Sequence, residues 1–95
     1  SFIGANLTGA KLTGVKGDDA DFTDAIVSRA DFNNASLADA DFTGAIATGT
    51  YFTSTDLSSV DFTGASLSGA NFYGAFCYFT VGVDGATKIT DCPNE

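Results

Sequence analysis

Small and large apolar residues repeat along this chain with a period of five, in one frame from Ser1 to about Phe79. The positions divisible by five are small: Ala5, Ala10, Val15, Ala20, Ala25, Ala30, Ala35, Ala40, Ala45, Thr50, Thr55, Val60, Ala65, Ala70 and Ala75. Two residues later the side chain is larger and apolar in all but two of the units before Cys77, and Gly17 and Ala47 are the exceptions. Helix faces repeat at 3.6 residues and strand faces at 2, so neither regular element fits. The pattern predicts units with two inward positions each.

The two residues after each large position are mostly Thr, Ser, Gly, Asn or Asp, as in Thr43-Gly44. These residue types suit turns, because Gly admits positive φ and Asn or Asp can bond the nearby backbone. Each unit is therefore predicted to be one short extended side followed by one corner.

Taking every fourth unit sorts the large positions into uniform columns, and this favours four sides per coil. Two columns are rich in Phe: Phe2/Phe22/Phe42/Phe62 and Leu12/Phe32/Phe52/Phe72. The other two hold smaller groups: Leu7/Val27/Ala47/Leu67 and Gly17/Leu37/Leu57/Cys77. A three-sided coil would mix Phe with Leu, whereas four sides let identical rings stack at strand spacing and keep the bore filled. The expected core is Phe22, Phe32, Phe42, Phe52, Phe62, Phe72, Leu37, Leu57 and Leu67.

Several units closely resemble the A(D/N)LXX motif of pentapeptide repeat proteins, among them 20–24, 40–44 and 70–74. The resemblance covers about five sixths of the chain and implies an all-β fold, a right-handed quadrilateral parallel β-helix of about four coils. It implies little about activity, because the known roles of the family differ. The unit 15–19 lacks a large central residue, and we expect a local bulge or thin wall there. Mild widening is expected at the bulkier Thr50, Thr55 and Val60.

Length and composition predict one small domain, with a β-helix at 1–79 and a C-terminal tail or cap at 80–95. Four coils at ~4.8 Å each give a rod roughly 20 Å long. The sequence contains no run of 18 apolar residues, so no membrane insertion is expected. The first coil has no amphipathic helix over its open edge, and we expect a preceding segment or a partner to cover it.

The tail loses the repeat, with a turn expected at 81–85 and a short strand at 87–90. Cys77 at the last inward position and Cys92 in the tail suggest a disulfide that pins the tail across the open end. The Cys, Asp-Gly, Cys order also resembles the ending of some cyanobacterial and chloroplast pentapeptide proteins. In the entropy model a loop of about 15 residues is worth roughly 3 kcal/mol. A bond would indicate an oxidising compartment, and the alternative is a buried thiol and a free tail thiol.

The charge balance is acidic, with twelve Asp and Glu against four Lys and Arg. Nucleic-acid binding needs a basic footprint, so this class is not expected. Asp21, Asp41 and Asp61 fall in one column, which allows two interpretations. One is a ladder for a cation or a basic partner, since hard cations take carboxylate oxygens. The other, which we favour, is a solvated motif residue that bonds its own turn.

Catalytic chemistry has little support in the sequence. There is no His, so Ser-His and Cys-His nucleophile pairs and zinc sites of Cys and His type are absent. The adjacent Asp18 and Asp19 lack an apolar pocket that would tune one of them. A packed bore leaves no cavity for a substrate or cofactor. We expect neither an enzyme nor a bound cofactor.

Two outward features depart from the polar norm and are the candidate partner-binding residues. Ile26 and Ile46 replace the usual Asp or Asn on one wall, one coil apart, beside Arg29. Aromatic residues gather toward the C-terminal coils, namely Tyr51, Tyr73, Tyr78, Phe76 and Phe79. Exposed apolar patches on small proteins often mark contacts. For Phe76 and Phe79 we favour the alternative that the tail covers them as a cap core.

The sequence therefore predicts a rigid β-helical rod that works through protein contacts. By analogy with lumenal members of the family, we expect export to an oxidising compartment, the thylakoid lumen, where the partner would be a photosynthetic membrane complex. Periplasm and cell exterior are alternative locations. Alternative functions are an acidic mimic of duplex DNA that binds a topoisomerase such as gyrase, and a cation-binding soluble lumenal protein. The sequence does not indicate an oligomeric state.

Overall fold

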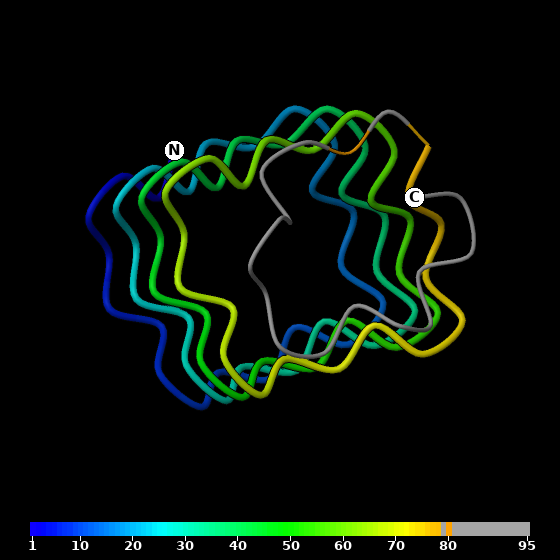
Figure 1. Ribbon diagram of the computed structural model, residues 1–95, viewed down its shortest axis with the longest axis horizontal. Coiled ribbons are helices and arrows are strands. Elements are labelled where there is room, and N and C mark those ends of the chain that lie inside the picture. Colours follow the sequence, from blue (N-terminus) through cyan, green and yellow to red (C-terminus); the bar gives the residue numbers. More distant parts are fainter. Residues whose placement is uncertain (79, 81–95) are drawn as a thin grey trace.

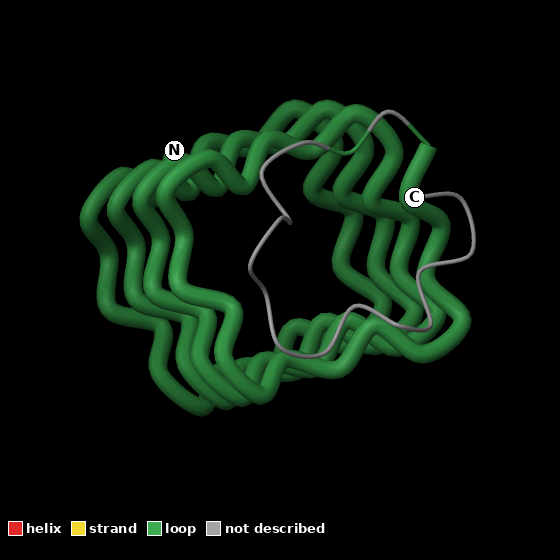
Figure 2. Tube along the Cα trace, viewed as in Figure 1, coloured by secondary structure: helices red, strands yellow, loops and turns green. Residues whose placement is uncertain are grey.

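In the computed structural model, residues 1–78 and 80 are described. These residues wind as a four-sided solenoid around a central bore (Figure 1). Each parallel bridge joins a residue to the one twenty positions later, from Asn6↔Ile26 to Asp56↔Phe76. One coil therefore takes four five-residue units. The described residues contain isolated bridges at every fifth position and turns between them, with no helix and no continuous strand (Figure 2).

The four walls of the solenoid follow from this period. Wall 1 comprises residues 1–4, 20–24, 40–44 and 60–64. Wall 2 comprises residues 5–9, 25–29, 45–49 and 65–69. Wall 3 comprises residues 10–14, 30–34, 50–54 and 70–74. Wall 4 comprises residues 15–19, 35–39, 55–59 and 75–78. The tail features predicted at 81–95, together with Phe79, lie outside the described residues.

Backbone hydrogen bonds hold the coils together and close every corner. The Phe22 N–H donates to Asp41 O in the next coil at 2.7 Å, and the Asp41 N–H donates back to Ala20 O at 3.0 Å. The Ala25 N–H donates to Phe22 O at 2.9 Å and closes the corner. At every corner from Gly4 to Gly74 the third turn residue has positive φ. A four-residue turn with positive φ at this position alone is of type II.

The bore is filled by two columns of stacked rings that meet edge to face. Phe22 and Phe42 on wall 1 stack with ring centroids 4.6 Å apart, and Phe32 and Phe52 on wall 3 stack at 5.4 Å. Between the walls, Phe22 and Phe32 meet at 5.8 Å with an interplanar angle of 88°. Both geometries are favourable for aromatic pairs, at about 0.5–1.5 kcal/mol each beyond burial. All nine core residues expected from the sequence are buried: Phe22, Phe32, Phe42, Phe52, Phe62, Phe72, Leu37, Leu57 and Leu67.

The first and last coils differ in how far their inward side chains are covered. Phe2 is 42% exposed in the first coil, and Leu7 and Leu12 are only partly buried. In the last coil Phe72 is 1% exposed and Cys77 is 1% exposed. The cap predicted at 80–95 lies, from residue 81 on, outside the described part of the chain and stays a prediction.

The expected bulge at Gly17 is absent. The Gly17 N–H donates to Ser36 O at 2.7 Å and the Asp19 N–H to Ala38 O at 2.9 Å, as at neighbouring corners. Leu37 fills the missing side chain's space, because a Cβ on Gly17 would lie 2.9 Å from its Cδ2. The wall stays regular because the coil above supplies the volume that the glycine lacks.

Threonine at an inward small position makes a bond that the sequence pattern did not reveal. The Thr50 and Thr55 hydroxyls are fully buried and donate to the carbonyls of Val27 and Phe32 at 2.8 and 2.6 Å. Their turn bonds are 3.2 Å long, against 2.9–3.0 Å where the small residue is Ala, and the widening of the coil expected at Thr50, Thr55 and Val60 stays a prediction. Thr80 makes the same hydroxyl bond, to Leu57 O at 2.6 Å. The repeat frame therefore reaches residue 80, one residue beyond the predicted boundary.

The coils stack along the shortest axis of the molecule, the direction in which Figure 1 looks down the bore. The Cα extents are 29 × 25 × 20 Å. The solenoid is therefore a short block, wider than it is tall. Its outer surface consists of four flat walls on which side chains stack in columns.

Candidate functional site

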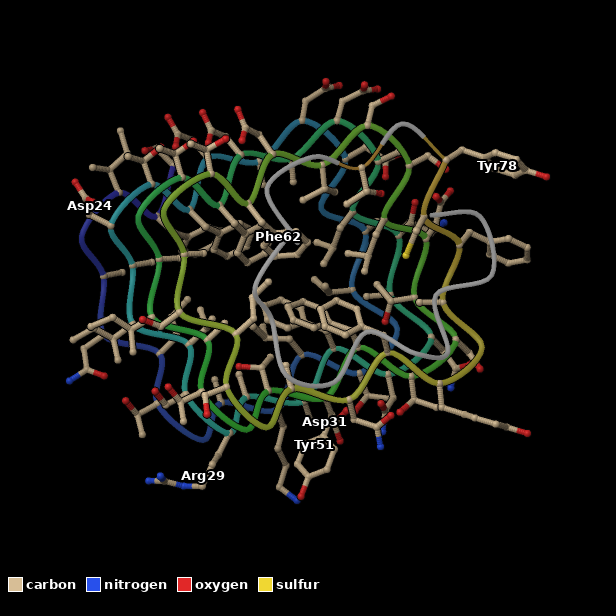
Figure 3. All side chains as sticks on the ribbon, viewed as in Figure 1. Asp24, Arg29, Asp31, Tyr51, Phe62 and Tyr78 are labelled. Carbon is tan, nitrogen blue, oxygen red and sulfur yellow. The ribbon has the colours of Figure 1, made fainter. Side chains whose placement is uncertain are left out.

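Charge is segregated between two halves of the outer surface. Walls 1 and 4, the acidic half, carry eight of the nine described aspartates and Lys16, a formal side-chain charge of −7. Walls 2 and 3, the neutral half, carry Lys11, Arg29 and Asp31, a charge of +1. Figure 3 shows Asp24 at the corner between walls 1 and 2, and Arg29 at the corner between walls 2 and 3. Because twenty residues make one coil, charges that are scattered along the sequence fall on two sides of the outer surface.

The aspartates of wall 1 are engaged with their own turns. The carboxylates of Asp21, Asp41 and Asp61 each accept the backbone N–H two residues later at 2.9 Å. The Thr23 hydroxyl also donates to Asp21, at 2.6 Å. Each carboxylate of this column therefore bonds its own turn, which is the interpretation favoured from the sequence. The turn bonds explain the aspartate at these positions without any ligand.

The same bonds shift the acidity of two of these groups. The Thr23 hydroxyl and then its backbone amide lower the pKa of Asp21 below its ordinary value of 3.8. Thr63 lowers the pKa of Asp61 in the same order of causes, side chain first and backbone second. Hydrogen bonds to the charged form favour ionisation, so both carboxylates stay charged to a lower pH than an ordinary aspartate.

Asp18 links two coils in the unit that lacks a large central residue. Its carboxylate accepts bonds from the Ser36 hydroxyl at 2.5 Å and the Ala38 N–H at 3.2 Å.

Among the described residues no group of three His, Cys, Asp or Glu side chains is placed to hold a metal ion. The described part of the chain also contains no helix long and apolar enough to cross a membrane.

Ile26 and Ile46 form a bridged pair on wall 2, as their spacing predicted. Ile46 is 43% exposed and Ile26 is half-buried beneath it. The column continues with Asn6 below and Ser66 above, so these two residues are its apolar part.

Arg29 occupies a corner at which the rest of the column is glycine: Gly9, Gly49 and Gly69. Its φ is 57°, in the left-handed region. The other six non-glycine residues with positive φ are Asp, Asn or Ser, residue types short enough to bond locally. A Cβ on Gly49 would lie 3.4 Å from Arg29 Cγ, so the arginine stem rises along the corner toward the next coil. In the sequence pattern Arg29 stands out only as the neighbour of Ile26 and Ile46. The glycine at all the other positions of its column is the feature that marks it as unusual.

Tyr51 follows this corner on wall 3 and is 47% exposed, paired with Asp31 below and Asn71 above. Figure 3 shows Arg29, Asp31 and Tyr51 pointing outward at the same side of the molecule. Ile26 and Ile46 thus lie on wall 2, Arg29 at the corner that ends this wall, and Tyr51 on wall 3 directly after that corner, and we call these four residues the edge patch.

The C-terminal aromatics are divided between the neutral and the acidic half. Tyr73 lies on wall 3 and is 64% exposed, whereas Phe76 and Tyr78 lie on wall 4, in the acidic half, and are 52% and 54% exposed. The tail that was expected to cover Phe76 as part of a cap core lies outside the described residues, so that expectation stays a prediction. The candidate partner-binding residues therefore divide between two sides of the molecule.

Comparisons with known proteins agree with this architecture. A family model described as pentapeptide repeats matches residues 1–37 and 35–74, with eight copies. No curated protein matches the sequence significantly.

Solved structures with the same winding include a pentapeptide repeat protein from the thylakoid lumen of Arabidopsis thaliana. It is 26% identical with a TM-score of 0.82, over 87% of this chain and 57% of that one. HetL, a pentapeptide repeat protein involved in heterocyst differentiation regulation in the cyanobacterium Nostoc sp. strain PCC 7120, is 26% identical with a TM-score of 0.81. That match covers 90% of this chain and 41% of HetL.

A third structure, the pentapeptide repeat protein Rfr23 from the cyanobacterium Cyanothece 51142, shares the fold at 17% identity and a TM-score of 0.57. This chain spans about half the length of the first two solved proteins. The repeat copies over residues 1–74 and the matching solenoids lead to one conclusion: the chain belongs to the pentapeptide repeat family and has its right-handed quadrilateral β-helix.

Proposed function

We propose that this protein is a non-enzymatic, rigid interaction module and works as a peripheral subunit or assembly factor of a photosynthetic membrane complex on its lumenal side. The observation that carries the proposal is the edge patch. Exposed Ile46 and Tyr51 and a corner arginine depart from the residues that the repeat places in the same columns. A packed bore and flat walls leave the outer surface as the place where function can reside.

The proposed location is the thylakoid lumen. It is supported by the similarity to the lumenal protein of Arabidopsis thaliana, with its TM-score of 0.82. The proposed Cys77–Cys92 disulfide would suit this oxidising compartment, and Cys77 is buried at the end of its column. Cys92 lies outside the described residues, so the pairing stays a prediction.

Two other functions are weaker proposals. A DNA mimic would need carboxylates along a length comparable to a turn of duplex, about 34 Å, whereas the solenoid is 20 Å along its axis. A cation ladder on wall 1 would compete with the turn bonds that Asp21, Asp41 and Asp61 already accept.

The test is native fractionation of the tagged full-length protein in the organism that makes it. We expect the tag to be protected from protease in intact thylakoids and to co-sediment with a photosynthetic complex. We also expect no alkylation of the cysteines without reductant, read from the intact mass.

A tag that sediments at the mass of the free protein in every fraction would overturn the proposed partner. A protein that carries two alkyl labels and is digested with the cytosolic fraction would overturn the proposed location.

A further inference from the structure

We propose that the edge patch of Ile26, Arg29, Ile46 and Tyr51 docks a segment of a partner protein that presents a carboxylate beside apolar side chains. The inference rests on the proposed interaction function and names the chemistry of the partner. Three independent observations support it: charge segregation, a cationic corner held in an unfavourable conformation, and apolar exposure next to that corner.

The first observation is the distribution of charge. The neutral half carries two of the three described cationic side chains, Lys11 and Arg29, and one aspartate, whereas the acidic half carries −7. An acidic partner is repelled by walls 1 and 4 and directed to walls 2 and 3, because like charges across an interface are penalised. The segregation therefore selects which side of the block such a partner meets.

The second observation is the conformation of Arg29. A φ of 57° is unfavourable for a residue with a side chain. The other coils have glycine at this corner, the residue that adopts positive φ at no steric cost. Residues held in such regions cluster at functional sites. Within the described residues the Arg29 side chain makes no ion pair or hydrogen bond, so its guanidinium donors have no ligand inside the fold. The aspartates of wall 1, by contrast, bond their own turns.

The third observation is what surrounds the guanidinium. Ile46 precedes the corner and Tyr51 follows it, at 43% and 47% exposure. Gly49, in the next coil of the same corner column, lies against the Arg29 stem, because a Cβ at this position would be 3.4 Å from Arg29 Cγ. Tyrosine and arginine are the residue types enriched at binding hot spots, and arginine binds a carboxylate with two parallel hydrogen bonds. An apolar residue next to a carboxylate is the matching ligand.

The column pattern supplies variants with little risk to the fold. Arg29→Gly, Ile46→Ser and Tyr51→Asn each install the residue that the next coil has in the same column, at Gly49, Ser66 and Asn71. Ile3→Thr is the matched control, because Ile3 is 60% exposed on wall 1 and its column otherwise holds threonine. Thermal melting of each variant checks that the solenoid is intact.

The probes are three synthetic peptides with blocked ends. The first is Ser-Leu-Phe-Glu-Leu-Glu-Ser, and the other two have both Glu residues replaced by Gln or by Lys. Binding is followed by amide chemical shifts of the labelled protein at low salt. We expect the Glu peptide to bind about tenfold more tightly than the Gln peptide, the ratio that one charge-assisted contact worth 1.4 kcal/mol produces. Shifts should be largest around Arg29, Ile46 and Tyr51.

Arg29→Gly should abolish the difference between the Glu and Gln peptides, and Ile46→Ser and Tyr51→Asn should weaken both. Ile3→Thr should leave all three affinities unchanged. Salt at 0.5 M should reduce the preference for Glu, since exposed charges are screened. The proposal is overturned if the Glu peptide shows no preference over Gln, or no binding up to millimolar concentration. It is also overturned if the largest shifts lie at Asp21, Asp41 and Asp61.

Failure of this inference is distinguishable from failure of the proposed function. If the native complex retains the triple variant Arg29→Gly/Ile46→Ser/Tyr51→Asn, the module binds through another surface and only the inference fails. If the wild type binds the Glu peptide at the edge patch but never co-sediments with a photosynthetic complex, the inference stands and the proposed role fails.

Discussion

The acidic and neutral halves of this solenoid share one backbone and one core, yet their outer surfaces follow different rules. On wall 1, Asp21, Asp41 and Asp61 bond their own turns, so their carboxylates help to shape the corners. Walls 2 and 3 hold a corner arginine whose side chain has no partner among residues 1–78 and 80, an exposed isoleucine and an exposed tyrosine. A regular repeat explains the first set and not the second. Departures from a column, rather than unusual composition, are where function is to be sought in such a fold.

The largest effect is expected from changing the length of a coil, because both halves exist only if twenty residues return the chain to the same wall. Deleting residues 40–59 removes one coil and should leave a folded, shorter solenoid. Deleting seven residues within that range shifts every later inward side chain to the wrong phase and should prevent folding. Far-UV circular dichroism and thermal melting compare the two deletion variants. Equal spectra and equal melting temperatures would refute the twenty-residue coil.

The core should respond alike in both halves. Phe42→Ala on wall 1 and Phe52→Ala on wall 3 each remove a fully buried ring from a stacked column. We expect each to lower the free energy of unfolding by about 3–5 kcal/mol, as large-to-small core substitutions do. The outward Thr43→Ala should cost far less. Denaturant unfolding measures the three, and a Phe42→Ala protein as stable as Thr43→Ala would contradict the packing described here.

The corner residues sharpen the comparison at a smaller scale. Arg29→Gly should raise the free energy of unfolding by about 1 kcal/mol, because left-handed backbone costs a residue with a Cβ roughly that much. Asp24→Gly, at φ 59° in the acidic half, should gain less, since aspartate tolerates this region better. If Arg29→Gly melts lower than wild type, the arginine stabilises the fold and its retention needs no partner.

The smallest effect is a difference in acid sensitivity. The folded pKa values of Asp21 and Asp61 lie below 3.8, so the stability they contribute is present above the unfolded pKa and lost as pH falls through the folded one. The double variant Asp21→Asn/Asp61→Asn should therefore lose less of its melting temperature than wild type between pH 6 and pH 3. Asparagine keeps an acceptor for the turn bond. An unchanged pH dependence would show that these carboxylates do not contribute.

The fold was largely predictable from the sequence because a packed bore constrains every inward position. Phe22 could be placed under Phe42 from the period alone, and the rings stack as expected. Compensation between coils was not predictable, because Leu37 reaches into the space of Gly17 only once both are in place. The bonding of Thr50 to a carbonyl of the coil below was hidden for the same reason.

The candidate site was predictable only in part. Ile26 and Ile46 departed visibly from the motif, and their registered positions on one wall followed from the period. The importance of Arg29 depends on its backbone conformation and on Gly49 above it, which the sequence shows only as a difference within a column. The position of Tyr78 in the acidic half likewise became clear only when each residue was assigned to a wall.

The most direct test of the account is side-chain oxidation footprinting of the full-length protein in its native complex and free in solution. Ile46 and Tyr51 represent the neutral half, and Ile3 and Tyr78 represent the acidic half with comparable exposure. Binding through the edge patch predicts that Ile46 and Tyr51 become protected in the complex while Ile3 and Tyr78 are oxidised as fast as before. Protection of Ile3 and Tyr78 with Ile46 and Tyr51 still reactive would show that the acidic half is the interface, and it would contradict the central claim.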